Sequence, residues 1–175
     1  MPAKKTTSGK DVAARPANPL AVAGQKMEEF GKYINIAKDF ALIPQGGVKL
    51  VEPTRDLAMK LIAFFDLSYD TELISKEEKK LKNSKGQTLT GVMYTMKATV
   101  STSEGVTSSG HGIASTLESH TVGREDHDAM ARAETRALKR AIEGRVGLPM
   151  INQLIMRMFG GFTVGPSKER ELGLR

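Results

Sequence analysis

Four cationic residues in one segment have the types and spacing needed to bind a polyanion. They lie within residues 125–145 (EDHDAMARAETRALKRAIEGR) and are Arg132, Arg136, Lys139 and Arg140. At about 100° per residue of an α-helix they fall in one arc. The rise of the helix makes this ladder about 12 Å long, which suits a short run of consecutive phosphates. Such contacts neutralise charge without reading bases, so we expect sequence-independent, salt-sensitive binding.

The opposite arc of this predicted helix is apolar. It consists of Met130, Ala133, Ala137, Leu138, Ala141 and Ile142. Alanines recur every four residues from Ala129 to Ala141, and this small-residue stripe would let the helix lie close to a sheet. Glu134 also falls in the apolar arc, where a buried carboxylate needs a partner, which we expect across a subunit boundary.

A second basic set lies on a predicted β-hairpin. Its members are Lys79, Lys80, Lys82 and Lys85. They could form another wall of the same binding surface. The alternative is that they only keep a surface turn soluble.

The residues offer no recognisable catalytic site. The chain has no Cys, no GxxxxGK[ST] loop and no GxSxG motif, and the spacing of His120, Asp126 and His127 matches no standard metal site. Asp70, Glu78 and Lys80 could suggest a magnesium-dependent nuclease, but they share one predicted strand and its charged end. We therefore expect a binding protein rather than an enzyme, with no cofactor and no metal.

Composition narrows the setting in which such a protein would act. The chain has 175 residues and a formal net charge of +6, which favours a polyanionic partner. The lack of Cys is consistent with a reducing compartment, and no apolar run approaches the length of a membrane span. The expected location is cytoplasmic, associated with the nucleoid or with phage DNA, and no membrane partner is expected.

Hydrophobic periodicity predicts an α+β fold in which helices cover one face of an antiparallel β-meander. Residues 1–24 are expected to be a flexible basic arm, 25–160 one DNA-binding and oligomerisation domain, and 161–175 a flexible tail. Strands are expected at 67–81, 89–102 and 106–115, after a hairpin at 40–51. Helices are expected at 25–37, 54–65 (packed on a sheet), 125–145 and 149–159.

At these residues the chain resembles the Rad-fifty-two superfamily of single-strand annealing proteins, including phage and archaeal relatives. That family has a β-β-β-α core, a Gly-aromatic-Gly triplet at the end of the third strand, and a helix of the form Lys-Glu-Ala-x-Thr-x-Ala-Leu-Lys-Arg-Ala. Here Gly110-His111-Gly112 is followed, after a similar gap, by AETRALKRA at 133–141. The similarity covers about half of the chain, residues 67–159. His111 replaces the usual Tyr, and the residues after the helix are only loosely similar.

The resemblance implies an ATP-independent protein of recombination and repair that binds single-stranded DNA and anneals complementary strands. It also implies a homo-oligomeric ring or arc with DNA in a basic groove, and groove residues at Lys139 and Arg140. A recombination nuclease or a single-strand-binding protein is a further candidate partner.

Two other functions fit the same sequence. The order helix, three strands, helix also occurs in double-stranded RNA-binding domains, where lysines at the start of the last helix contact phosphates. Here that helix start is acidic (Glu125, Asp126, Asp128), which disfavours this alternative. The other is a phage or viral structural protein whose basic arm neutralises nucleic acid.

Overall fold

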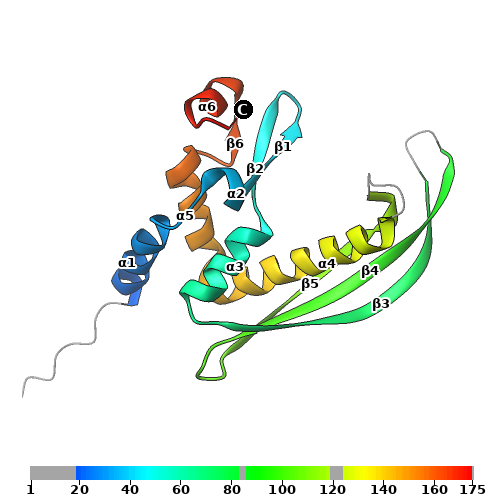
Figure 1. Cartoon of the computed structure of the whole chain (residues 1–175), viewed down its shortest axis with the longest axis horizontal. Helices are drawn as coiled ribbons and strands as arrows, with labels where there is room; N and C mark the ends of the chain where they lie inside the picture. Colours follow the sequence, from blue (N-terminus) through cyan, green and yellow to red (C-terminus); the bar gives the residue numbers. More distant parts are fainter. Residues whose placement is uncertain (1–18, 83–85, 119–123, 175) are drawn as a thin grey trace, which may run out of the picture.

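A long helix packed on a three-stranded antiparallel sheet forms the centre of the protein (Figure 1). The computed structural model describes residues 19–82, 86–118 and 124–174. The sheet has the order β3-β4-β5. Its strands are β3 (Ser68–Lys82), β4 (Thr88–Ser101) and β5 (Thr107–Ser115), and the helix is α4 (Glu125–Ile142). The predicted α+β meander covered by a long helix is confirmed.

The middle strand alternates as the sequence predicts. On β4, Tyr94, Met96, Ala98 and Val100 are buried beneath α4, whereas the residues between them are only half-buried. The register pairs Ala98 with Thr71 on β3 and with Gly110 on β5. This register brings the glycine triplet of β5 under the helix.

Direct backbone contact between α4 and β5 fixes the height of the helix above the sheet. A Cβ atom on Gly112 would lie 1.9 Å from the carbonyl oxygen of Ala133, and one on Gly110 would lie 2.5 Å from that of Ala137. The alanines of α4 that face the sheet are completely buried: Ala129, Ala133, Ala137 and Ala141. Glycine on the strand and alanine on the helix are therefore both required by the close approach.

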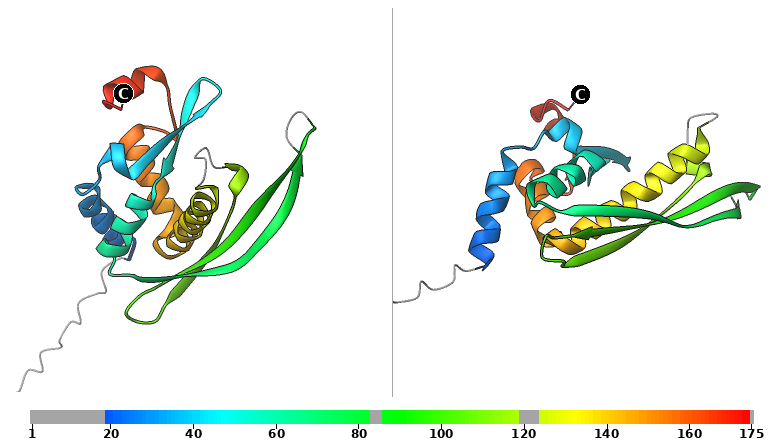
Figure 2. Two further views of the ribbon diagram at one scale, coloured as in Figure 1. Left: turned by 45° about the vertical axis from the view of Figure 1, so that its right-hand side comes forward. Right: turned by 60° about the horizontal axis from the view of Figure 1, so that its bottom comes forward.

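The smaller elements lie around the C-terminal half of α4 (Figure 2). They are α1 (Pro19–Gly31), α2 (Ile36–Asp39), α3 (Arg55–Phe64) and α5 (Leu148–Phe159), with a second sheet of order β1-β2-β6. The strands of that sheet are β1 (Phe40–Gln45), β2 (Val48–Pro53) and β6 (Thr163–Val164). A turn of π-helix, Glu143–Gly147, joins α4 to α5.

Several predicted elements agree closely with the structure. Gly46 and Gly47 have φ of 55° and 88° and make the expected turn between β1 and β2. The side chain of Thr54 caps α3 by accepting a hydrogen bond from Leu57 N, and Pro149 lies in the first turn of α5. The predicted helix at 125–145 is right, but its last residues belong to the π-helical turn.

Several expectations about individual elements were wrong. The helix expected at 25–37 is two helices, because Asn35 and Asp39 bond to the local backbone and begin a separate turn at Ile36. The helix α3 packs mainly on α4 instead of on a sheet.

Another concerns the C-terminal tail, which was expected to be flexible. Its residues pair with β2 through β6 and then form α6 (Pro166–Glu171), where Glu169 forms an ion pair with Lys49. Residues 1–18 of the expected N-terminal arm lie outside the described part, but its last residues, 19–24, are helical and belong to α1 instead of to a flexible arm. Within the described ranges no helix combines the length and apolar character needed to cross a bilayer.

The contact at Gly112 gives a direct test of this packing. Gly112→Ala should lower the free energy of unfolding by about 1–3 kcal/mol or more, because its methyl group would overlap the α4 backbone. Gly24→Ala is the matched control, since a Cβ atom added at this exposed position of α1 would meet nothing within 4 Å. That change should be neutral or stabilise by about 0.5–1 kcal/mol. Urea denaturation measures both, and equal stability of the two variants would contradict the close approach.

Candidate nucleic-acid interface

A shallow hollow of about 450 Å³ runs along the face of α4 that points away from the sheet. Seven α4 residues line it: His127, Asp128, Ala131, Arg132, Thr135, Arg136 and Lys139. Three of the four cationic residues predicted from the helical arc therefore share one surface. Arg140 is exposed but lies outside this lining.

Two arginines of α4 reach sideways to the edge strand β5. Arg136 Nη1 donates to the carbonyl oxygen of Ile113 at 2.5 Å, and Arg140 Nη1 donates to that of His111 at 2.5 Å. Four residues of helix rise about 6 Å, close to the length of two strand residues, so successive arginines meet successive carbonyls of one edge. These bonds orient the guanidinium groups and occupy part of the edge of β5.

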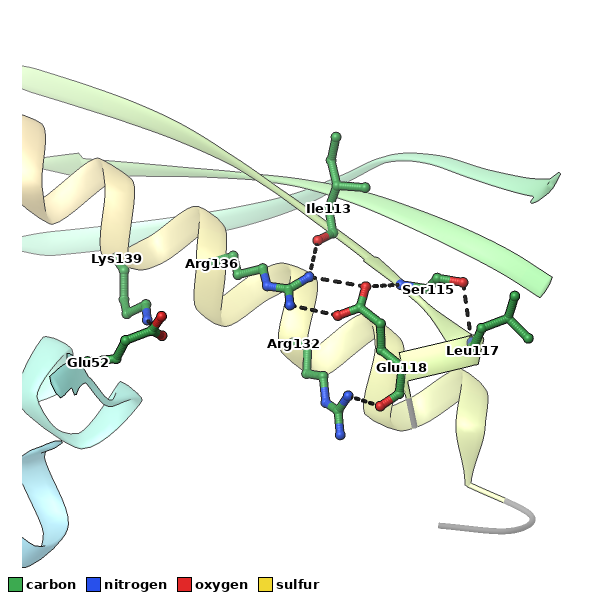
Figure 3. A network of polar contacts seen from close by, with 8 residues as sticks. All are labelled: Glu52, Ile113, Ser115, Leu117, Glu118, Arg132, Arg136 and Lys139. Atoms are coloured by element: carbon green, nitrogen blue, oxygen red, sulfur yellow. Dashed lines mark hydrogen bonds and ion pairs between the residues drawn. The ribbon is translucent and has the colours of Figure 1, made fainter. Parts of the chain in front are cut away.

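A carboxylate from a neighbouring short helix also contacts the guanidinium group of Arg136 (Figure 3). Glu118 ends the 3₁₀ turn Thr116–Glu118, and its Oε2 accepts from Arg136 Nη2 at 2.6 Å. Its Oε1 accepts from Arg136 Nη1 at 3.3 Å and from the main-chain N–H of Ser115 at 3.0 Å. Arg132 donates to the main-chain oxygen of Glu118.

The groups around Glu118 shift the pKa of its carboxyl. The hydrogen bond from Arg136 holds the pKa of the Glu118 carboxyl below its ordinary value; partial burial opposes this, and the Ser115 N–H lowers the pKa further. Glu118 is therefore ionised at neutral pH. The side chains of Arg136 and Glu118 are 42% and 38% exposed, so both remain open to solvent.

Lys139 points to the other side of the ladder, toward the strand β2. Its Nζ donates to the carbonyl oxygen of Pro53 at 3.0 Å and lies 3.6 Å from Glu52 Oε2. The Lys139 side chain is only 21% exposed, while that of Glu52 is 41% exposed. The two residues singled out by the family resemblance, Lys139 and Arg140, thus lie on opposite flanks of α4.

One turn farther along, Glu143 lies close to the same cations. Burial raises the pKa of its carboxyl, and the positive charges of Lys139 and Arg140 act in the opposite direction. Glu143 thus brings a third carboxyl group to the cations of the ladder, beside Lys139 and Arg140.

The partner of Glu134 lies within the same chain. Arg55, the first residue of α3, contacts it with both Nη atoms, at 3.3 Å and 3.1 Å. The carboxylate that was expected to find a partner across a subunit boundary instead ties α3 to α4. No sequence pattern pointed to this pair, because the two residues are far apart in the chain.

The two hairpin lysines whose side chains are described, Lys79 and Lys80, do not line the hollow. Lys79 forms an ion pair with Glu77 at 2.7 Å, and the neighbouring Lys76 lies 3.4 Å from Asp126 at the acidic start of α4. Lys80 is exposed on β3. Lys85 and the side chain of Lys82 lie outside the described residues, so the predicted second wall stays a prediction.

The Gly-His-Gly triplet has a structural role on this surface. Gly110 and Gly112 admit the helix, whereas His111 is exposed and its carbonyl oxygen accepts the bond from Arg140. Within the described part of the chain, no three His, Asp or Glu side chains gather in a way that could hold a metal ion.

Comparison with known proteins gives no independent assignment. The chain matches no protein-family profile, and no curated protein is significantly similar to it in sequence.

The Arg136–Glu118 pair predicts a pH effect. Arg136→Ala should raise the pKa of the Glu118 carboxyl toward the ordinary glutamate value of about 4.3. Because the folded-state pKa is lowered, the pair stabilises the fold above that pH, and this contribution is lost as pH falls through the lowered pKa. The stability difference between wild type and variant should thus shrink on acidification. Urea denaturation across the acidic range measures it, and a pH-independent difference would contradict the pairing.

Proposed function

We propose that the protein binds single-stranded DNA along α4 and anneals complementary strands without ATP, in recombination and repair. The observation that carries the proposal is the hollow beside α4, lined by Arg132, Arg136 and Lys139 on one continuous helical face. Guanidinium and ammonium groups at helical spacing match the repeated charge of a phosphate backbone. Arg140, on the β5 flank, would contact a neighbouring phosphate.

The lining favours contacts to the backbone over contacts to bases. Apart from His127 at the start of α4, it contains no ring on which a base could stack, and Thr135 already donates its hydroxyl to the carbonyl oxygen of Ala131. Single-strand binders that hold bases tightly use aromatic platforms. A strand held here only through its phosphates would keep its bases free to pair, as annealing requires.

The proposed assembly is a homo-oligomeric ring or arc. Two of the outer strands of the described sheets, β3 and β1, have an edge without a strand partner in the described chain. Apolar side chains are exposed on α5, at Leu148 and Met156. Unpaired edges and exposed apolar residues are common subunit contacts, and repetition of the basic face around such an assembly would extend the binding track.

The charge of α4 argues against binding to double-stranded RNA. Its first turn carries Glu125, Asp126 and Asp128, and its basic residues begin later. A double-stranded RNA-binding domain needs cations at that first turn.

The decisive measurement compares ligands. Binding to single-stranded DNA, duplex DNA and duplex RNA would be measured at two salt concentrations, with particle mass recorded alongside and strand annealing followed without nucleotide. We expect preference for single-stranded DNA by an oligomer. Preference for duplex RNA by a monomer would refute the proposal.

Lys139→Ala combined with Arg140→Ala tests the site. This double variant should bind single-stranded DNA more weakly, and the slope of log K against log salt should fall by about 0.7 per lost phosphate contact. Lys168→Ala with Arg170→Ala, on the distant helix α6, removes the same charge and is the matched control (Figure 1). Equal losses in both variants would show that only net charge matters and that α4 is not the site.

A further inference from the structure

Glu118 is held as a bound anion would be held. Its carboxylate receives both Nη atoms of Arg136 and the main-chain N–H of Ser115, while Arg132 adds positive charge nearby. A planar guanidinium fork combined with a main-chain N–H is a common way for proteins to bind phosphate as well as carboxylate. The two arginines also line the hollow proposed to take the DNA backbone.

We propose that Arg136, with the Ser115 N–H, forms a phosphate subsite of the DNA track, and that Glu118 occupies this subsite until a nucleic-acid phosphate displaces it. The inference rests on the proposed function and adds a residue that the basic ladder by itself does not identify. Glu118 acts here as an internal competitor for the phosphodiester.

The surrounding bonds allow the exchange. Arg136 keeps its hydrogen bond to the carbonyl oxygen of Ile113 when the carboxylate leaves, so the guanidinium stays oriented for a new anion. Glu118 lies at the end of a three-residue turn, and its side chain is already 38% exposed, so the displaced carboxylate can be hydrated without rearrangement of the core.

Displacement of Glu118 would also favour binding of a polynucleotide over binding of a single small anion. A single small anion must replace a carboxylate that is covalently tethered beside Arg136 and therefore present at high effective concentration. A polynucleotide contacts Arg132 and Lys139 at the same time, and these contacts offset the cost of displacing Glu118. The competitor thus weakens binding of isolated phosphates more than binding of a strand.

Glu118→Gln removes the competing charge and keeps an oxygen that can accept from Ser115 N–H. We expect the affinity for an oligothymidylate to rise about tenfold, in line with the strength of charged hydrogen bonds. The control is Glu104→Gln in the exposed turn between β4 and β5, which changes net charge equally. In an Arg136→Ala background, Glu118→Gln should have no larger effect than Glu104→Gln.

The wild-type protein offers a second readout. Carboxyl labelling with a carbodiimide, located by mass spectrometry, should show that labelling of Glu118 increases when the oligothymidylate binds. Carboxylates that the DNA merely covers should instead be labelled less. This measurement does not depend on whether any variant folds.

The outcomes separate the two proposals. If wild-type protein binds no single-stranded DNA, the proposed function fails. If it binds but Glu118→Gln matches Glu104→Gln, if the gain persists without Arg136, or if labelling of Glu118 falls on binding, the displacement proposal is overturned.

Discussion

The structure depends on the close approach of α4 to β5. At Gly110 and Gly112 there is no room for a side chain between the strand and the helix backbone. Buried alanines complete the contact from the helix side. This steric constraint sets the distance and rotation of α4 relative to the sheet. Every basic residue of the helix takes its position from that geometry.

One consequence is that the arginines lie within reach of the edge of β5. Because the helix is so close to the strand, Arg136 and Arg140 can donate to main-chain carbonyls, and these bonds orient the guanidinium groups. Ordered guanidinium groups lose less conformational entropy when they bind an anion than freely moving ones. The packing of two small-residue surfaces therefore also prepares the positive face.

The positive face of α4 also carries carboxylates from other elements of the fold. Glu118 on one flank forms an ion pair with Arg136, and Glu52 on the other flank forms one with Lys139. Glu143 lies beside Lys139 and Arg140. A helical wheel shows the cations of α4 but not the carboxylates that other elements bring to them. The electrostatic character of the hollow is thus a property of the tertiary structure, in which polyanion binding competes with internal ion pairs.

The sequence by itself determined the α+β meander, the positions of most elements and the amphipathic character of α4. These features follow from local periodicity, glycine turns and capping residues such as Thr54, which act over a few residues. The tertiary structure decided which side each cation faces, that Glu134 pairs with Arg55, and that the last residues form β6 and α6 instead of a loose tail. Those outcomes depend on contacts between segments distant in the chain, and a pattern confined to neighbouring residues carries no information about them.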